Sequence, residues 1–292
     1  MEVETEQLHA AVLAWYEAHR RWLPWRAGGV DGWQVLVSEV MLQQTPVSRV
    51  LPVYEQWMAR WPTPAALAAD GAGEAIRMWG RLGYPRRALR LHAAAVMIEQ
   101  RHQGNVPGAF DDLRALPGVG EYTAAAVCAF AYRQRQVVLD TNVRRVLARV
   151  RFGVQHPSPS VTNRERDAAR ELLPHDPAEA ATWSVGLMEL GALVCTATTP
   201  ACERCPAGHA CRWRAAGWPP QSGRRPRSQA YAGTDRQCRG TILAVLRGSD
   251  RPVAVAAVES VWSNTRQRER ALTSLVDDGL VVWADEGRLA LP

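Results

Sequence analysis

Apolar residues recur at intervals of three and four from the N-terminus to about Trp213, which is the spacing of one face of an α-helix. Turn signals separate these stretches, such as Gly-Gly-Val-Asp-Gly at 28–32 and Pro-Gly-Val-Gly at 117–120. Alternating patterns typical of strands are scarce in this part of the chain. The pattern therefore predicts a mainly helical domain, with helices over residues 8–16, 33–42, 88–98, 122–131, 143–150 and 181–194.

The composition changes after this region. Residues 218–228 are rich in Pro, Gly, Ser and Arg, which predicts an exposed basic linker. We therefore expect a helical domain over 1–217, a linker over 218–235 and a small α+β domain over 236–292.

The segment 236–292 predicts three short helices followed by two strands around an Asp-Glu-Gly turn. This is the element order of a winged-helix domain, whose third helix would contact DNA. A small capping or protein-contact domain explains the same pattern equally well. The predicted helices cover 241–246, 254–262 and 265–276, and the third carries Arg266, Arg268 and Arg270.

Composition narrows the possible functions. The chain of 292 residues has a formal charge of +6, which fits a polyanionic partner, and it has no 18-residue apolar run that would span a membrane. The start, MEVETEQ, shows no secretory signal, so we expect a cytoplasmic protein of bacterial type, associated with the nucleoid and monomeric. All 35 basic residues are arginine. Without lysine, P-loop phosphate binding is excluded, and a Schiff base could form only on the N-terminal amine.

Four of the six cysteines fall in one short segment, as Cys195-x6-Cys202-x2-Cys205-x5-Cys211. In a reducing compartment such a cluster indicates metal ligands rather than disulfides. Thiolates at these separations suit either tetrahedral zinc or an iron–sulfur cube, and the spacing alone does not decide between them.

Two carboxylates occur in unusual surroundings. Glu39 lies inside an apolar helical stretch, where desolvation would raise its pKa and suit it to act as a general acid. Asp140 follows an apolar run and precedes a helix. The plainer alternatives are a solvent-facing Glu39 and an Asp140 that only caps its helix. Together the two would match the logic of two-carboxylate glycosidases, in which one group protonates the leaving group and the other stabilises a cationic sugar.

The segment Leu116-Pro-Gly-Val-Gly120 is a tight turn that opens directly into a helix. Gly118 and Gly120 permit close backbone approach, and the free N–H groups of the helix start favour an anion such as a DNA phosphate. The main-chain carbonyls of Arg114, Leu116 and Val119 could hold a monovalent cation. An ordinary helix start is the alternative.

Together these motifs resemble the helix–hairpin–helix DNA glycosylase superfamily, and specifically the MutY-type adenine DNA glycosylases. The resemblance implies a helix–hairpin–helix fold and a [4Fe–4S] cluster rather than zinc. It also implies double-stranded DNA with A:8-oxoG or A:G mispairs as substrate. The matching segments are Leu23-Pro-Trp-Arg26, Ser38-Glu-Val-Met-Leu-Gln-Gln-Thr45, Leu82-Gly-Tyr84, Leu116-Pro-Gly-Val-Gly120, Leu139-Asp140 with Asn142-Val143, Glu189-Leu-Gly-Ala192 and the four cysteines.

The resemblance also assigns roles to residues of this chain. Glu39 matches the acid that protonates adenine, and Asp140 matches the carboxylate that stabilises the oxocarbenium-like sugar. Tyr122 and Asn142 match neighbours that orient these two groups. The remaining matches are the adenine-pocket residues Trp25 and Arg26, the DNA-wedging residues Gln44 and Tyr84, and the phosphate-binding Gly118 and Gly120.

Three related functions are alternatives. The bifunctional endonuclease III type carries a catalytic Lys where this chain has Tyr122, so we expect excision without efficient strand cleavage. Thymine-mismatch glycosylases share that Tyr but typically lack the Glu that matches Glu39. A non-catalytic iron–sulfur DNA-binding regulator explains the cysteines, the charge and the tail, but gives no reason for Glu39 and Asp140.

Overall fold

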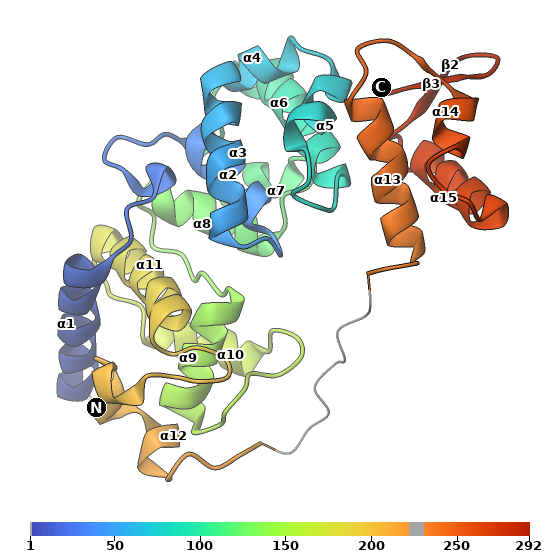
Figure 1. The fold of residues 1–292 in the computed structure, drawn as a ribbon. Coiled ribbons are helices and arrows are strands. Elements are labelled where there is room, and N and C mark those ends of the chain that lie inside the picture. Colours follow the sequence, from blue (N-terminus) through green and yellow to red (C-terminus); the bar gives the residue numbers. More distant parts are fainter. Residues whose placement is uncertain (1, 222–230) are drawn as a thin grey trace. The chain divides into compact units, whose positions relative to one another are not determined.

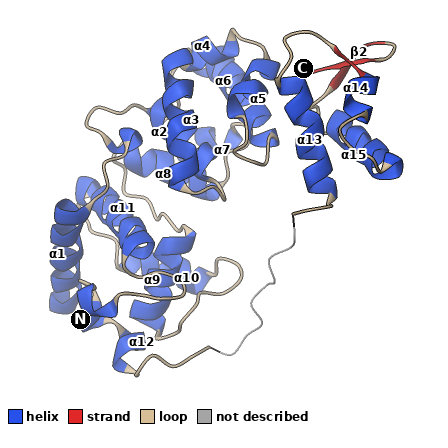
Figure 2. Cartoon of the chain, in the orientation of Figure 1, coloured by secondary structure: helices blue, strands red, loops and turns tan. Residues whose placement is uncertain are grey.

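The computed structural model describes residues 2–221 and 231–292, and these are mainly helical with one small sheet near the C-terminus (Figures 1 and 2). The chain divides into two compact units that each combine separate segments of sequence. The first consists of Met1–Val35, Gly108–Arg114 and Val119–Arg224, and the second of Leu36–Pro107, Ala115–Gly118 and Arg225–Pro292. None of the described helices is long and apolar enough to cross a membrane.

The first unit is built around helix α9, against which α10, α11 and α12 pack, while α1 packs on α11. Its core joins apolar side chains of α1, α9 and α11, including Val12, Leu147 and Leu190. Its elements are α1 (Glu2–His19), η1 (Pro24–Arg26), α8 (Glu121–Phe130), α9 (Thr141–Phe152), α10 (Asn163–Glu171), α11 (Pro177–Leu193), η2 (Cys202–Arg204), η3 (Gly208–Ala210) and α12 (Arg212–Ala215).

The second unit contains a helical part and the C-terminal segment. Trp57, Trp61 and Trp79 are fully buried in the helical part, and Trp57 contacts the other two rings edge to face, with centroids 4.6 and 5.9 Å apart. Its helices and strands are α3 (Val47–Arg60), α4 (Pro64–Ala68), α5 (Ala72–Trp79), α6 (Arg86–His102), α13 (Asp235–Arg247), β1 (Val253–Ala254), α14 (Val255–Glu259), α15 (Thr265–Asp277), β2 (Val282–Asp285) and β3 (Arg288–Ala290).

Two helices straddle the division between the units, namely α2 (Gly32–Leu42) and α7 (Phe110–Ala115). With these, every helix that the apolar spacing predicted before Trp213 is present. The observed helices generally extend beyond the predicted stretches, because their first turns contain polar capping and charged residues that carry no apolar signal. For example, α9 begins at Thr141, two residues before the predicted stretch, and the side chain of Asp140 caps it.

The C-terminal segment has the order α13, β1, α14, α15, β2, β3, which is that of a winged helix. The three strands form an antiparallel sheet in the order β1-β3-β2. The sequence did not predict β1, and the helix predicted over 254–262 is shorter, at Val255–Glu259. Two residues are too few for an alternating pattern, and β1 exists only because Val253 pairs with Leu289 of β3. Part of the predicted linker, residues 222–230, lies outside the described residues, and the domain boundaries stay a prediction.

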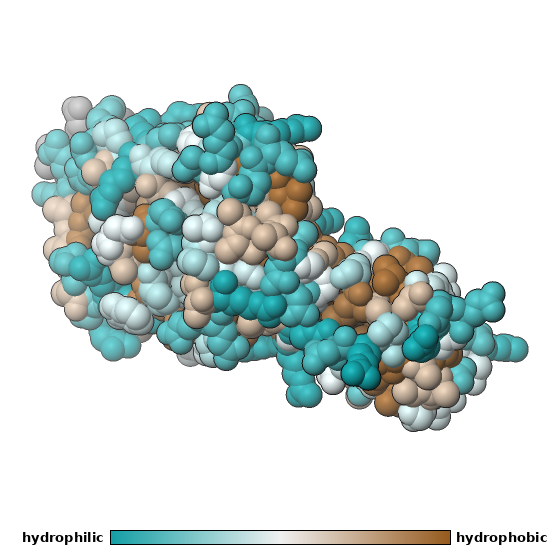
Figure 3. Space-filling model, turned by 90° about the horizontal axis from the view of Figure 1, so that it is seen from above, coloured by the Kyte–Doolittle hydropathy of each residue, from teal (hydrophilic) through white to brown (hydrophobic). Residues whose placement is uncertain are grey.

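Hydrophilic side chains cover much of the surface seen in Figure 3, with apolar side chains exposed between them. Among the large apolar residues that stay exposed are Trp22, Tyr84 and Trp283. Tyr84 is one of the residues that the sequence predicted to contact DNA.

Candidate active site and iron–sulfur site

Glu39 is buried in α2, with 4% of its surface exposed. Its helix neighbours Val35, Val40 and Met41 are also buried, so the apolar stretch faces the interior as the pattern indicated. The alternative in which Glu39 lies on a solvent-facing side of the helix is therefore wrong. A carboxyl at this position is desolvated and belongs to the second unit, whereas Asp140 belongs to the first.

Asp140 caps α9 and is half-buried. Its Oδ1 accepts a hydrogen bond from the N–H of Val143 at 2.6 Å, and its Oδ2 accepts one from Asn142 Nδ2 at 2.9 Å. Burial raises the pKa of Asp140, while these two donors and the charge of Arg145 hold it down in part. The capping role is therefore confirmed, but the group is also more desolvated than a surface cap needs to be.

Arg145 connects Asn142 to the cysteine segment, and the sequence did not single it out. Its Nη2 donates to Asn142 Oδ1 at 2.7 Å and to the carbonyl of Gly191 at 2.6 Å, and its Nε donates to the carbonyl of Cys195 at 2.7 Å. A Cβ at Gly191 would lie 2.6 Å from Cβ of Asn142, so only glycine lets α11 approach Asn142 this closely. This contact explains the glycine of the Glu189-Leu-Gly motif.

Glu189 is completely buried and holds two arginines. Arg21 donates to both carboxylate oxygens, at 2.6 and 2.8 Å, and Arg26 Nη1 donates to Oε2 at 2.8 Å. Burial alone would raise the pKa of Glu189, but the two guanidinium groups outweigh it and lower the pKa to about 2. Arg26 and the buried Trp25 form η1, so Glu189 fixes the segment that the sequence predicted to line the adenine pocket.

The two residues predicted to wedge into DNA have strained backbones. Gln44 has φ of 54° and Tyr84 has φ of 48°, in the left-handed region that favours glycine. Arg87, which is 6% exposed, donates hydrogen bonds to the residue that precedes each of them. It donates to the carbonyls of Gln43 at 2.6 Å and Gly83 at 3.0 Å, which are the residues preceding Gln44 and Tyr84.

Arg87 also donates to Val40, Met41 and Thr45, at 2.9, 3.0 and 2.9 Å. The contacts with Val40 and Met41 satisfy carbonyls at the end of α2, which have no partner within the helix, and the third contact is to the hydroxyl of Thr45. Burial lowers the pKa of Arg87 to about 10, so the guanidinium stays charged at neutral pH. Sequence reasoning missed this residue because the second Arg of an Arg-Arg pair carries no signal of burial.

Tyr122 lies in the first turn of α8 and lines a cavity of about 440 Å³ in the first unit. Leu139, the residue before Asp140, lines the same cavity. The rim carries Arg135, Arg166 and Arg170. Arg166 pairs with Glu121 at 3.1 Å, so part of this positive charge is already balanced.

The turn between α7 and α8 places its two glycines differently. Gly118 has φ of +81°, and a Cβ there would lie 2.8 Å from Cβ of Arg90, so glycine is required by both backbone and packing. Gly120 caps α8 in an extended conformation, and no atom lies within 4 Å of the place of a Cβ. The open space at Gly120 leaves the first N–H groups of α8 approachable by an anion.

Cys195, Cys202, Cys205 and Cys211 line one cavity, together with apolar side chains of α9 such as Val146 and Val150. All four are free cysteines. Among the described residues, no three His, Cys, Asp or Glu side chains form a group that could hold a metal ion. What supports a sulfur-ligated group here is the convergence of four cysteines on a cavity with apolar walls.

Arg149 supports the same interpretation. It is 1% exposed, and its Nη1 donates to Sγ of Cys195 at 3.1 Å and to the carbonyl of Thr196 at 2.8 Å. Its guanidinium lies 4.7 Å from the ring centre of Trp213. A buried cation against a cysteine sulfur is electrostatically matched to a thiolate, which is the form that ligates iron. The residues present therefore fit an iron–sulfur cluster.

Residues 37–171 match the family of HhH-GPD superfamily base excision DNA repair proteins. The solved structure of a thermostable thymine-DNA glycosylase superposes with a TM-score of 0.65 over 74% of this chain and 98% of that one, at 24% identity. This likeness confirms the predicted helix–hairpin–helix glycosylase fold.

Two sequence relatives refine the class. An adenine DNA glycosylase of Mycobacterium tuberculosis is 53% identical over 283 residues, covering 96% of this chain and 92% of that protein. A thymine/uracil-DNA glycosylase of Pyrobaculum aerophilum is 35% identical over 208 residues, covering 70% of this chain and 90% of that protein. The chain belongs to the adenine DNA glycosylases of base excision repair, as its motifs predicted, and the thymine alternative is not favoured.

The Glu189 pair yields a stability prediction with a defined pH dependence. The change Glu189→Gln leaves Arg21 and Arg26 without their buried counter-charge, and we expect it to lower the free energy of unfolding by about 3–5 kcal/mol at pH 7. Because the pKa of Glu189 is lowered to about 2, its contribution is complete above its ordinary pKa of 4.5 and is lost as the pH falls towards 2. The difference from wild type should therefore shrink below pH 4.5, as measured by urea unfolding.

An exposed ion pair provides the control for this measurement. The change Glu17→Gln breaks a pair with Arg20 on the surface of α1 and should cost less than about 1 kcal/mol. Equal losses in the two variants would contradict the prediction.

Proposed function

We propose that this enzyme hydrolyses the N-glycosidic bond of adenine that is mispaired with 8-oxoguanine or guanine in double-stranded DNA. The bond is unreachable while the base is stacked, so the adenine nucleotide must first leave the duplex. The observation that carries the mechanism is the burial of Glu39 inside the segment that resembles the adenine-specific family. This burial also weighs against a non-catalytic DNA-binding regulator, for which a desolvated carboxyl has no evident use.

Glu39 would be the proton donor. Adenine is a poor leaving group as an anion, and a proton on the base turns it into a neutral one. The buried position of Glu39 among apolar residues of α2 supports this role.

Asp140 would stabilise the positive charge that develops on the sugar as adenine departs. Its carboxylate form is needed for this, and the donors Asn142 and Val143 favour that form. Tyr122 would orient the reacting groups from α8. Because the chain has no lysine, the product would be an intact strand with an abasic site.

The remaining predicted residues would hold the DNA. Trp25 and Arg26 would form a wall of the adenine pocket, and Gln44 and Tyr84 would wedge into the stack beside the orphaned base. The turn with Gly118 and Gly120 would bind a phosphate through the N–H groups of α8. The main-chain carbonyls of Arg114, Leu116 and Val119 would hold a monovalent cation there.

Cys195, Cys202, Cys205 and Cys211 would hold a [4Fe–4S] cluster. When bound, such a cluster ties four points of a loop together through iron–thiolate bonds. Arg149 would balance thiolate charge at Cys195, and Arg145 would keep the carbonyl of Cys195 in contact with Asn142.

Two variants test the two-carboxylate mechanism. Each replaces a carboxyl group by an amide of similar shape, which removes the proton donor at Glu39 or the negative charge at Asp140. Glu39→Gln should slow adenine excision at least about 100-fold, and Asp140→Asn about 10²–10³-fold, in single-turnover assays on an A:8-oxoG duplex. Duplex affinity should change far less, because phosphate contacts supply most of it.

Asp176→Asn is the matched control, since Asp176 caps α11 as Asp140 caps α9. Because Asn caps a helix about as well as Asp, this change should cost less than about 1 kcal/mol of stability and leave excision unchanged. Near-normal excision by a folded Asp140→Asn enzyme would remove that residue from the mechanism. The same result for Glu39→Gln would refute the proposed chemistry.

The pH profile tests the role of Asn142. Burial raises the pKa of Asp140 above its ordinary value of 3.8. As the pH is lowered, the rate of excision should therefore begin to fall before the pH reaches 3.8. Asn142→Ala removes a donor that favours the carboxylate, so it should raise the pKa further and move the acid limb to higher pH. A purely structural role would lower the rate at every pH without moving the limb. Asn105→Ala, at an exposed position, should leave the profile unchanged.

The cluster is tested by metal analysis of protein prepared anaerobically. It should contain about four iron atoms per chain and show visible sulfur-to-iron charge-transfer absorption. Cys202→Ala should lower both and weaken DNA binding, whereas Cys238→Ala, a buried cysteine outside the cluster spacing, should not. Stoichiometric zinc without iron would overturn the assignment.

A further inference from the structure

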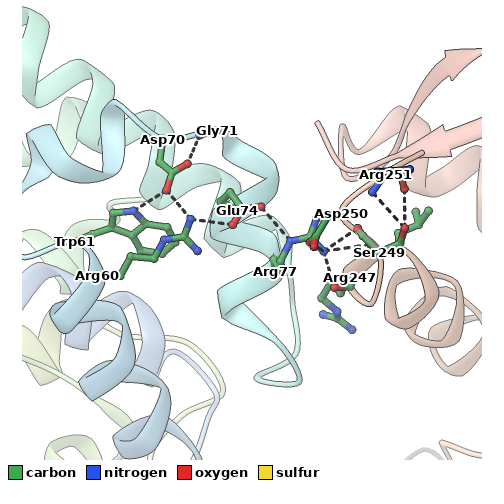
Figure 4. Close-up of polar contacts among 11 residues, drawn as sticks. Arg60, Trp61, Asp70, Gly71, Glu74, Arg77, Arg247, Ser249, Asp250 and Arg251 are labelled. Carbon is green, nitrogen blue, oxygen red and sulfur yellow. Dashed lines mark hydrogen bonds and ion pairs between the residues drawn. The ribbon is translucent and has the colours of Figure 1, made fainter. Parts of the chain in front are cut away.

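The C-terminal segment is attached to the helical part of the second unit by a reciprocal pair of arginines, Arg77 and Arg247, and Figure 4 shows the contacts of Arg77. Arg77, in the last turn of α5, donates through Nη1 to the carbonyls of Arg247 at 2.5 Å and Ser249 at 2.9 Å. Arg247, in the last turn of α13, donates in return to the carbonyl of Gly80 just after α5. Each guanidinium therefore satisfies carbonyls at the end of the other helix, where intrahelical partners are missing.

Arg77 is also held by residues of the helical part. Its Nε donates to Glu74 at 3.0 Å, and Glu74 pairs with Arg60 at 2.9 Å. Arg60 also pairs with Asp70, so a continuous chain of ion pairs leads from α3 to the C-terminal segment, as Figure 4 shows.

Two further contacts involve the ends of α15 and of the chain. Asp278, which follows α15, pairs with Arg86 at the start of α6 at 3.2 Å and with Arg239 of α13 at 2.6 Å. The carbonyl of Pro292 accepts a hydrogen bond from the N–H of Gly73 at 2.7 Å. A Cβ at Gly73 would lie 2.5 Å from that oxygen, so the glycine permits the contact.

These contacts flank one short connection, residues 80–85 between α5 and α6. Arg247 binds its first residue, Gly80, and Asp278 binds Arg86, the residue that follows it at the start of α6. Between them lies Tyr84, which is 53% exposed and has a strained backbone. The C-terminal segment thus holds both ends of the connection that presents Tyr84.

The charge of the C-terminal segment does not favour a second DNA-binding surface. Residues 231–292 contain eight arginines and eight acidic residues. Of the three arginines of α15, Arg268 pairs with Glu259 at 3.2 Å and Arg270 with Asp235 at 3.3 Å. A duplex-binding domain needs excess positive charge for the phosphates, and this segment has none.

We propose that the winged-helix segment is a positioning element, which braces the connection 80–85 so that Tyr84 is held ready to enter the DNA stack. The proposal rests on the proposed role of Tyr84. In this arrangement Arg247 and Asp278 act through Tyr84 and do not contact the substrate. The partner of the winged helix is the enzyme's own DNA-wedging connection rather than a second stretch of DNA.

Hydrogen exchange on the full-length protein tests the brace without DNA. The amides of Gly80, Leu82 and Arg87 donate to carbonyls within or beside this connection and so report on it. Arg247→Gln removes the donor to Gly80 and should speed their exchange about five- to tenfold. Unchanged exchange in a folded Arg247→Gln protein would overturn the proposal, with melting temperature measured in parallel.

Two further variants sharpen the exchange experiment. Arg251→Gln changes an exposed arginine of the same segment, and this matched control should have no effect on the three amides. Arg247→Lys keeps the charge and should restore part of the protection.

A double-mutant cycle tests the route to function. Arg247→Gln should slow single-turnover excision on an A:8-oxoG duplex, and this effect should disappear in the Tyr84→Ala background, because residues that act through one group are non-additive. An equal loss in both backgrounds would show that Arg247 acts elsewhere and would refute the brace. If Tyr84→Ala alone has no effect, the proposed role of Tyr84 fails, and the exchange measurement still decides whether the segment braces the connection.

Discussion

Buried and half-buried arginines that donate to main-chain carbonyls hold this structure together. Helix ends leave carbonyls without partners, and a guanidinium offers five N–H donors in a fixed fork, which can satisfy several carbonyls at once. Arg87 does this at the end of α2, Arg145 at the end of α11, and Arg77 and Arg247 at the ends of α13 and α5. An ammonium group has three donors on one atom and could not span such sites. In a chain without lysine, arginine is therefore the one strongly basic side chain available for these internal contacts.

The residues that we propose to take part in the reaction or in DNA contact are held in place by neighbouring arginines. Gln44 and Tyr84 occupy backbone conformations that cost of order 1–3 kcal/mol each, and such strain persists only where surrounding contacts over-determine it. Arg87 provides those contacts for both residues from a single buried position. Asn142 is held in the same way by Arg145, which in turn contacts the segment that begins the cysteine cluster.

The element order of the C-terminal segment does not by itself assign the segment a function. Its element order is that of a DNA-binding winged helix, yet its arginines are largely paired with its own acids or with carbonyls of the helical part. Topology alone does not specify function, because function depends on which side chains remain available at the surface. The polar contacts that the segment makes outside itself include those with Arg77 of α5, Gly80 and Arg86 of α6.

The sequence by itself determined the helical class, the family and the positions of Glu39, Asp140 and the four cysteines. Helical periodicity and motif spacing are local properties, so they can be recognised in the sequence without knowledge of the tertiary contacts. Burial and the contacts between residues far apart in the sequence were decided only by the tertiary structure. It buried Glu39 rather than exposing it, paired β1 with β3, and gave Arg87, Arg145 and Arg149 partners far away in the sequence. Long-range contacts of charged side chains leave no periodic signal, because an arginine reads as polar whether it faces water or a carbonyl in the core.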